Sequence, residues 1–365
     1  PLMAKLATEA KDNPDTWKMR GVRTIVMYPM NALVSDQVSR LRRLIGDPEG
    51  KFLNVFRSTC GETVRRPQFG MYTGRTPYPG NEPVTSEDRK LEKTLARMSF
   101  PQTDSEKSFF EALRHEGKIP AKMDMQTFLE GLHNGRHIPD AEDAELITRF
   151  EMQKFCPDIL ITNYSMLEYM LLRPREAKIW QDTKEWLEEN PSNKLLFVID
   201  EAHMYRGSSG GEVALLIRRL FHKLGITRDR VQFILTTASM PDRDQEDKNA
   251  VYKFAQELTA ADTTVEFCYL TGEKEQADTV ELRSIPLQSF QSADASAFEE
   301  NELVCFQALN QFWSGVEGST APFTDMASAC QWMYDNLIAY RPFHTLISKC
   351  RGNAVSLAEL AAEAF

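Results

Sequence analysis

Residues 195–203 read LLFVIDEAH, and this stretch is the most informative one in the sequence. An apolar run of strand length, Leu195–Ile199, is followed at once by Asp200 and Glu201, and then by Ala202 and His203. Nucleotide-hydrolysing α/β domains present acids in this way at the carboxyl edge of a parallel sheet, where one acid holds a metal ion and another orients a water. The stretch therefore predicts an α/β fold with a nucleotide site at the end of this strand.

Around this stretch, short β-branched runs alternate with segments of helical periodicity. The further strands that we expect are 23–28, 68–72, 158–162, 231–236 and 265–269. The helices that we expect are 2–10, 31–45, 166–172, 180–189 and 212–223, whereas the polar stretch 11–20, with Pro14, is typical of a loop. Strands that alternate with helices predict a mainly parallel sheet covered on both faces.

Two regions depart from this alternation. Residues 78–148, approximately, are rich in charge, Pro and Gly, and we interpret them as an insertion, either a small helical lobe or a partly mobile excursion. After about residue 272 the pattern becomes helical, and the last helix is expected to open with a capping box at Ser356–Glu359. The predicted domains are an α/β domain over 1–275 and a helical module over 276–365.

The composition restricts the class of protein. The chain has 365 residues and a net charge of −10, and its apolar runs are far shorter than the ~20 residues of a membrane span, so we expect no membrane segment. The acidic balance argues against a protein that coats nucleic acid, although a motor needs only local basic clusters. The six cysteines form no C-x-x-C pair, which argues against a zinc site and favours a reducing, cytoplasmic location.

Four further loops carry polar groups where strands are expected to end. In 28–37, YPMNALVSDQ, a strand turns into a helix whose N-terminal N–H groups suit a phosphate of a nucleic-acid backbone. The segment 161–167, ITNYSML, has the same arrangement, and 73–76, TGRT, offers backbone and Arg donors. Hydroxyls in 235–240, LTTASM, can hydrogen-bond to the region of His203. Each of these loops taken alone also fits an ordinary connection.

The order of the motifs is more specific than any single one. A strand followed by P-x-N-A-L-x-x-D-Q, then T-G-R-T, T-N-Y-S-M-L, D-E-A-H and T-A-S is the motif order in the first motor domain of superfamily 2 helicases. The sequence closely resembles the DEAH-type subgroup that includes the MrfA/YprA-like DNA-repair helicases and related large helicases of phage-defence systems. The resemblance covers roughly residues 20–75 and 150–275, and it is carried by YPMNALVSDQVSRLRRL, MYTGRTP, PDILITNYSMLEYMLLRP and VIDEAHMYRGSSGGEVALLIRRL.

This resemblance implies a RecA-like P-loop NTPase domain in an ATP-dependent motor that acts on DNA, with two RecA-like domains closing on ATP. Asp200 would hold Mg²⁺ through water, and Glu201 would activate the hydrolytic water. His203, with Thr237 and Ser239, would couple hydrolysis to movement. The residues implied to contact the backbone of one DNA strand are Pro29, Asn31, Thr73, Gly74, Arg75, Thr162 and Asn163.

The sequence departs from this family in two respects. No G-x-x-x-x-G-K-[ST] loop occurs in these residues, and a second RecA-like domain is missing. We therefore interpret the chain as a fragment of a larger DNA-repair or antiviral-defence protein, and we expect the chain alone to be inactive in ATP hydrolysis. The helical module would then be a linker that leads to the second RecA-like domain.

Two other functions remain open at this point. In the first, Asp200, Glu201 and His203 are direct ligands of a metal-dependent hydrolase, which would be active without nucleotide. In the second, the chain is a non-catalytic interaction module whose insertion, 78–148, docks a partner protein. The sequence also leaves open whether the nucleic acid is DNA or RNA.

Overall fold

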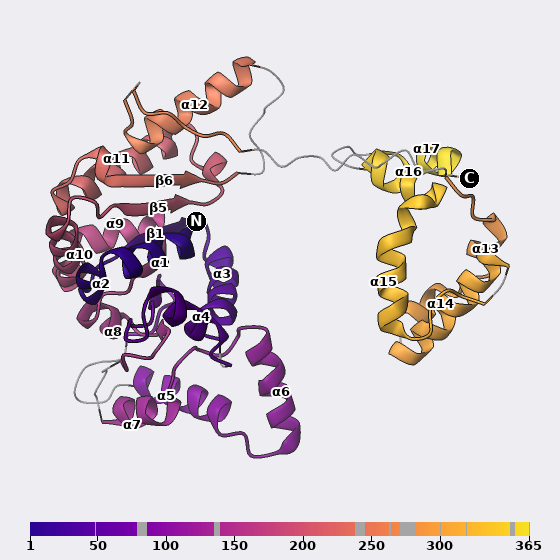
Figure 1. The fold of residues 1–365 in the computed structure, drawn as a ribbon, viewed down its shortest axis with the longest axis horizontal. Coiled ribbons are helices and arrows are strands. Elements are labelled where there is room, and N and C mark those ends of the chain that lie inside the picture. Colours follow the sequence, from indigo (N-terminus) through magenta and orange to yellow (C-terminus); the bar gives the residue numbers. More distant parts are fainter. Residues whose placement is uncertain are drawn as a thin grey trace. The chain divides into compact units, whose positions relative to one another are not determined.

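The computed structural model describes residues 1–47, 49–78, 86–134, 139–237, 245–262, 264–270, 282–299, 301–318, 320–350 and 355–364 (Figure 1). The chain divides into two compact units, residues 1–268 and 269–365, and each unit is described by itself. The domain boundary predicted at 275/276 lies outside the described residues.

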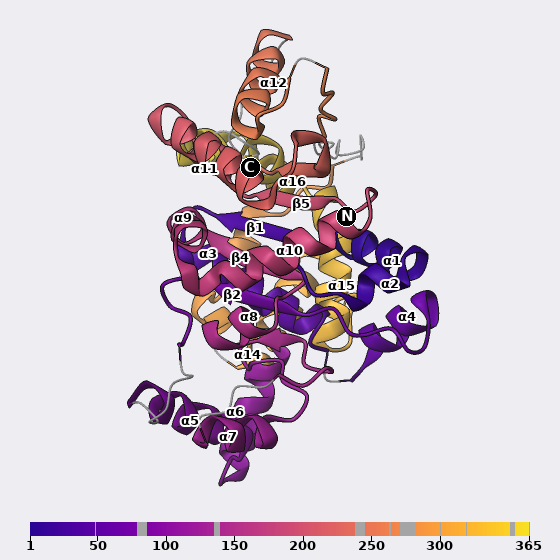
Figure 2. The ribbon, with the colours of Figure 1, turned by 90° about the vertical axis from the view of Figure 1, so that its left-hand side faces the viewer.

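Unit 1 is built on a six-stranded sheet in which all the paired strands are parallel, in the order β3-β2-β4-β1-β5-β6. The strands are β1 (Thr24–Tyr28), β2 (Phe69–Tyr72), β3 (Glu145–Leu146), β4 (Ile159–Asn163), β5 (Leu195–Ile199) and β6 (Val231–Leu235). Figure 2 shows β5, β1, β4 and β2 side by side with helices around them. The predicted α/β class with a parallel sheet is confirmed.

Helices cover both faces of this sheet, as the burial of β1 requires. Ile25 and Met27 join one core with residues of α9, α10 and α11, whereas Val26 and Tyr28 join the other with residues of α1 to α4. Successive side chains of a strand point to opposite faces, so a strand buried on both faces is apolar throughout. The α-helices of unit 1 outside the insertion are α1 (Leu2–Asp12), α2 (Pro14–Lys18), α3 (Asn31–Leu44), α4 (Lys51–Cys60), α8 (Arg149–Lys154), α9 (Tyr164–Leu172), α10 (Ala177–Glu189), α11 (Ser208–Leu224) and α12 (Gln245–Thr259). Short 3₁₀ turns are η1 (Pro174–Glu176), η2 (Ala202–Met204) and η3 (Arg228–Arg230).

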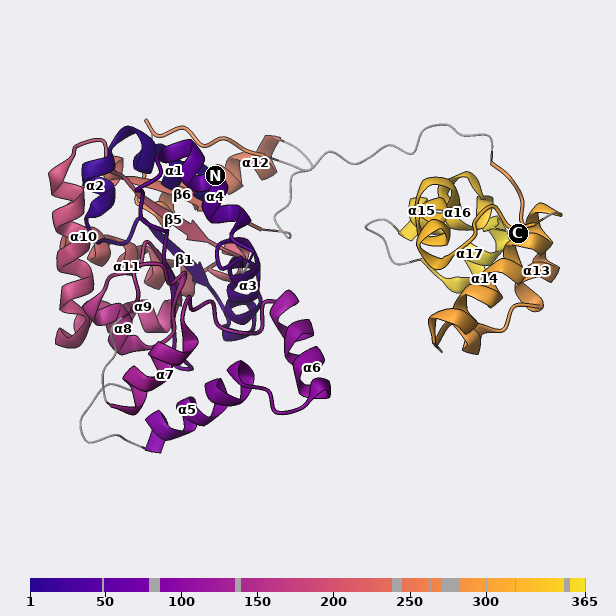
Figure 3. The ribbon, with the colours of Figure 1, turned by 60° about the horizontal axis from the view of Figure 1, so that its bottom comes forward.

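The described part of the insertion is a small helical lobe, α5 (Ser86–Ser99), α6 (Asp104–His115) and α7 (Met125–His133), which lies at the end of the sheet where β2 is (Figure 2). Figure 3 shows these three helices grouped together at the bottom of the view. Leu95 of α5 and Phe128 of α7 share a separate core with Ile147, at the point where the chain returns to the sheet. The described part of the insertion therefore has an apolar core of its own.

Two local predictions were wrong. The stretch 11–20 is not a loop throughout, because α1 continues to Asp12 and Pro14 opens α2 at the first helical position, where its missing N–H has no cost. Residues 265–269 form no strand: their exposure alternates between half-buried and exposed, with the period of a strand, but they pair with none of the strands in the described part of the chain.

A buried ionic cluster lies where β1 and β4 begin. The guanidinium of Arg23, fully buried, contacts the carboxylates of Glu9 (3.0 Å) and Asp158 (3.4 Å) and lies between the rings of Trp17 and Trp186, at 5.3 and 4.8 Å from their centroids. Arg65 binds both oxygens of Asp158 at 2.7 Å. Buried charges are stable only when they are paired in this way. The cluster fixes α1 and α2 to the amino edge of the sheet, away from the motifs.

Unit 2 is helical, as the sequence predicts, and has an aromatic core. Its helical segments are α13 (Leu287–Gln291), η4 (Ala295–Glu299), α14 (Glu302–Glu317), α15 (Met326–Asn336), η5 (Leu337–Ala339), α16 (Arg341–Cys350) and α17 (Leu357–Ala364). Trp313 is buried at the centre of the core, edge-to-face with Trp332 at 4.8 Å and with Tyr340 at 5.0 Å between ring centroids. Within the described ranges, no helix of either unit is long and apolar enough to cross a membrane.

Candidate nucleotide and nucleic-acid site

The predicted site residues lie along one edge of the sheet, because the parallel strands all end there. The carboxyl ends of β2, β4 and β1 are neighbours, and these ends and the segments that follow them hold the residues predicted to contact nucleic acid. The loops after β5 and β6 are the next two along the edge and hold those predicted to act on the nucleotide. The structure thus separates the two predicted sets into adjoining halves of one edge.

Asp200 leaves β5 with its backbone still part of the sheet, since its N–H donates to the carbonyl of Met27 in β1 at 3.0 Å. Its carboxylate accepts a hydrogen bond from the hydroxyl of Thr236, which follows β6. This hydrogen bond fixes one carboxylate oxygen at the strand end. A carboxylate held there can bind a hydrated Mg²⁺, which prefers oxygen ligands and keeps several waters.

Glu201 has a left-handed backbone, with φ 50° and ψ 46°, and it directly precedes η2. A non-glycine residue at positive φ is strained, and such strain is concentrated at functional sites. Its Oε2 atom is buried without a hydrogen bond, although the Nδ1 atom of His203 lies 3.2 Å away. The carboxylate of Glu201 therefore keeps one oxygen that accepts no hydrogen bond and lies next to the imidazole of His203.

His203 and Thr237 meet between β5 and β6. The Nδ1 atom of His203 lies 3.1 Å from the hydroxyl oxygen of Thr237, and the N–H of Ala202 donates to the carbonyl of Thr236 at 2.9 Å. The contact joins the end of the acidic strand to the end of its neighbour. Ser239, predicted to act with Thr237, lies outside the described residues.

Two tyrosines near Asp200 were missed by the sequence analysis. Burial, together with the Asp200 carboxylate, raises the pKa of both Tyr28 and Tyr205, so both hydroxyls stay protonated. The hydroxyl of Tyr205 is buried without a hydrogen-bond partner. Tyr28 directly precedes Pro29, and Tyr205 lies two residues after His203, so proximity to the motifs was the only signal.

The loops after β1 and β4 are joined by a side-chain contact. The amide of Asn163 donates to the Asn31 side chain at 2.7 Å, and its oxygen accepts from the N–H of Met166 at 2.8 Å, which caps α9. No side chain caps α3, which begins at Asn31 just after Pro29. The free N–H groups of an uncapped helix start suit a phosphate, so α3 offers this site and α9 does not.

The Thr73–Thr76 loop, which follows β2, is stabilised by its own hydroxyls. Thr76 Oγ1 accepts from the N–H of Thr73 (2.9 Å) and donates to the carbonyl of Met71 (2.6 Å), while Thr73 Oγ1 accepts from the N–H of Arg75 (3.2 Å). Thr73 is buried, as is Thr162, whose hydroxyl donates to the carbonyl of Tyr72 at 2.7 Å. Gly74 and Arg75 are exposed, and a Cβ atom on Gly74 would meet nothing within 4 Å. In this loop a ligand can therefore reach Gly74 and Arg75, whereas Thr73 and Thr162 hold the backbone beneath them.

The comparisons with known proteins agree with this geometry. The family model of the DEAD/DEAH box helicases matches residues 121–247, which include strands β3 to β6 and the acids after β5. Druantia protein DruE of Escherichia coli is 37% identical over 390 aligned residues, which cover 98% of this chain. The chain contains a DEAD/DEAH box helicase domain of superfamily 2.

The chain is also 29% identical, over 98 residues and 27% of its length, to the uncharacterized ATP-dependent helicase MJ1574 of Methanocaldococcus jannaschii. The chain spans only 20% of the length of DruE and 13% of the length of MJ1574. No solved structure matches it.

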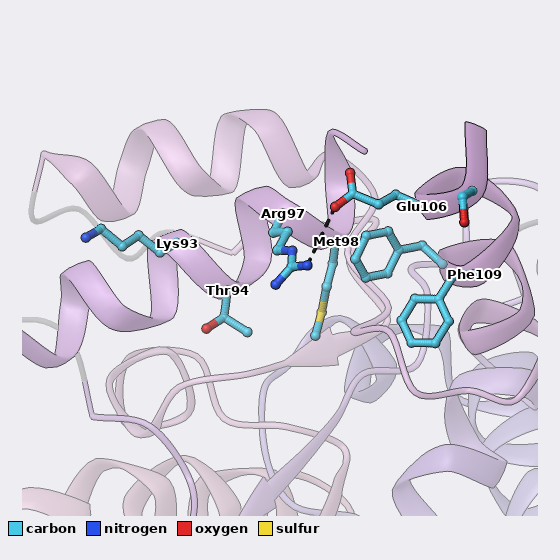
Figure 4. Close-up of a pocket in the computed structure, with 8 residues that line it drawn as sticks. Lys93, Thr94, Arg97, Met98, Glu106 and Phe109 are labelled. Atoms are coloured by element: carbon cyan, nitrogen blue, oxygen red, sulfur yellow. Dashed lines mark ion pairs between the residues drawn. The ribbon is translucent and has the colours of Figure 1, made fainter. Parts of the chain in front are cut away.

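Two further observations concern other kinds of site. In the described part of the chain, no three His, Cys, Asp or Glu side chains come together in a way that could hold a metal ion directly, as the hydrolase alternative requires. A cavity of about 570 Å³ lies between α5 and α6 of the insertion, next to Arg97, Met98 and Phe109 and apart from the helicase motifs (Figure 4).

Proposed function

We propose that the intact protein is an ATP-dependent motor that translocates along DNA or separates its strands. The arrangement of the edge carries this proposal: the loops after β5 and β6 hold Asp200, Glu201, His203 and Thr237, and the loops after β1, β4 and β2 lie directly beside them. A motor needs this adjacency, because hydrolysis at one group of loops must alter the grip of the next.

The residues at the acidic end fit Mg²⁺ and ATP. Asp200 would hold the ion through water, and the buried, unused oxygen of Glu201 is an acceptor for the proton of an attacking water. When bound, Mg-ATP supplies the phosphoryl group that is transferred. His203 would transmit the state of this site through its contact with Thr237 to the end of β6.

The nucleic-acid half of the edge fits a single strand held by its backbone. The uncapped start of α3, the exposed backbone at Gly74 and the exposed Arg75 are donors for phosphates, and phosphate contacts position a strand without reading its sequence. Binding should therefore be independent of sequence and should weaken as salt is raised. The choice of DNA over RNA is supported by the resemblance to DNA-repair and phage-defence helicases.

We further propose that the motor requires a second RecA-like domain from the intact protein and that it serves antiviral defence or DNA repair. The chain alone would then be inactive in ATP hydrolysis. A cytoplasmic location is supported by the cysteines, all six of which are free.

The test is ATP hydrolysis by the intact protein, with and without single-stranded DNA, beside its Glu201→Gln variant. We expect DNA to stimulate hydrolysis and the variant to lose about 100-fold or more of the rate, as expected when a general base is removed. Glu212→Gln, the same change at an exposed position in α11, is the matched control and should behave as the wild type. A Glu201→Gln variant that hydrolyses ATP at the wild-type rate would disprove the assigned role.

A second candidate function, docking of a partner protein, has one specific observation in its favour. Phe109 is 59% exposed and Phe100 is 46% exposed, and Phe109 lines the cavity between α5 and α6 (Figure 4). Exposed aromatic side chains next to a concave surface are typical of protein interfaces. Binding of DNA without any stimulated hydrolysis by the intact protein would favour this function over a motor.

A further inference from the structure

The insertion and the Thr73–Thr76 loop meet at Arg149, the first residue of α8. The Nη2 atom of Arg149 donates to the carbonyl of Thr73 at 2.6 Å, and its backbone N–H donates to the carbonyl of Pro77 at 2.9 Å. One residue therefore holds both sides of the loop, at Thr73 where it begins and at Pro77 where the chain leaves it.

The guanidinium of Arg149 is directed at the protein. It lies 5.5 Å from the centroid of the Tyr72 ring, and its Nε atom is buried without a partner. Tyr72 is itself fixed, since it is fully buried and its hydroxyl donates to Glu176 at 2.6 Å. Arg149 thus rests on a rigid support and uses a charge-assisted hydrogen bond to fix one carbonyl of the loop.

On its other side, α8 is attached to the insertion. Thr148 and Glu151 form a capping box at the start of α8, and the buried carboxylate of Glu151 also binds the ammonium of Lys122. Lys122 is buried, binds Asp143 at 2.9 Å and lies 4.5 Å from the ring of Phe128, a core residue of α7. Continuous contacts therefore run from the core of the insertion to the residue that holds the loop.

We propose that Arg149 is a positioning residue for nucleic-acid binding, which fixes the Thr73–Thr76 loop in its binding conformation and links that loop to the insertion. This inference rests on the proposed function, because it assigns to the loop the phosphate contacts described above. Fixing a loop before binding removes the cost of ordering it on binding, so affinity should fall when the loop is released.

The first test measures the affinity of the intact protein for a fluorescein-labelled deoxythymidine oligomer by anisotropy, from about 50 to 200 mM salt. Arg149→Ala should bind about ten-fold more weakly, the loss expected for one hydrogen bond to a charged group. Arg149→Lys, which keeps a cationic donor, should recover part of the loss. Lys154→Ala, an exposed cation on the same helix, is the matched control and should bind as the wild type.

The salt dependence separates positioning from direct contact. A residue that acts through the loop neutralises no phosphate, so Arg149→Ala should lower affinity and leave the slope of log K against log salt unchanged. Arg75→Ala removes an exposed cation of the loop itself. It should reduce the magnitude of this slope by about one, the contribution of a single phosphate contact. A smaller slope in Arg149→Ala, or wild-type affinity, would overturn the inference.

Hydrogen exchange tests the link to the insertion. In the wild type, the oligomer should slow amide exchange in residues 73–76 and also in 122–129, and Arg149→Ala should abolish the second effect. Protection of 122–129 that persists in the variant would overturn the link. If the wild-type protein binds no oligomer, the proposed function and this inference both fail. If the wild type binds and Arg149→Ala binds equally well, only this inference fails.

Discussion

At the scale of single residues, Glu201 combines the chemistry of the site with a conformational cost. Its left-handed backbone is unfavourable for a residue with a Cβ atom and acceptable for glycine. Evolution of a stable turn would favour glycine here, so the presence of a strained acid supports a role for its carboxylate.

This strain can be measured with two variants that both lack the carboxylate. Glu201→Gly should be more stable than Glu201→Ala by about 1 kcal/mol, because only the alanine keeps the penalty of positive φ. Chemical unfolding of the two variants, followed by circular dichroism, gives the difference directly. Equal stabilities would mean that the backbone relaxes out of the left-handed region.

Asp158 gives a residue-scale prediction about pH. Burial alone would raise its pKa, but the guanidiniums of Arg65 and Arg23 outweigh burial and hold the pKa below the ordinary value of 3.8. Because the folded-state pKa is the lower one, the carboxylate stabilises the fold fully above about pH 4, and this contribution is lost as the pH falls through the folded-state pKa.

We therefore expect Asp158→Asn to cost about 3–5 kcal/mol at neutral pH, since it leaves the buried Arg23 and the half-buried Arg65 short of a partner. The difference between wild type and variant should shrink as the pH is lowered below 4. Urea unfolding of both proteins across this range checks the sign, and a gap that widens in acid would contradict it.

At the scale of elements, the start of α11 shows why neighbouring glycines are not equivalent. A Cβ atom on Gly210 would lie 2.3 Å from the carbonyl oxygen of Tyr205, whereas one on Gly211 would meet nothing within 4 Å. The helix therefore approaches the loop that follows His203 closely, and Gly210 is the residue that permits this approach.

Gly210→Ala should destabilise unit 1 by about 1–3 kcal/mol, because backbone must move to admit the methyl group. Gly211→Ala should instead stabilise it by about 0.5–1 kcal/mol, the ordinary gain of alanine over glycine in a helix. Thermal unfolding of the two variants provides the comparison. If both substitutions changed the stability in the same direction, a single factor, helix propensity or packing, would determine both effects.

Elements buried on both faces were the ones that the sequence predicted well. Leu195–Ile199 is apolar throughout, and its predicted bounds are those of β5. By contrast, α4, α8, α12 and β3 were not predicted. Of these, α8 and β3 are short and are fixed by partners distant in sequence. The two residues of β3 are an example, held by Arg42, which binds Glu145 through two contacts of 2.7 Å.

The sequence motifs identified residues of the candidate site, but they did not reveal the contacts between those residues. The sequence placed Asp200, Glu201 and His203 after one strand, and their roles stay predictions. It could not show that Thr236 binds Asp200 or that Arg149 holds Thr73, because these contacts join residues 36 and 76 positions apart. Only the parallel order of the strands brings such residues together.

At the scale of the whole molecule, the two compact units have separate cores. The sheet and its helices lie in 1–268, and an aromatic core lies in 269–365. We expect residues 1–268, expressed alone, to keep a cooperative unfolding transition, since their cores contain no residue of unit 2. Loss of that transition, measured by calorimetry, would show that the sheet needs the helical unit.

The edge-to-face pair of Trp313 and Trp332 has an optical consequence. Two indoles whose centroids are 4.8 Å apart and whose planes cross at 72° couple their electronic transitions, and such coupling gives a paired positive and negative band in the ultraviolet dichroism spectrum. Trp17, Trp180 and Trp186 all lie in unit 1, so this couplet belongs to unit 2 alone. The protein thus contains a built-in chromophore that reports on its helical unit without any label.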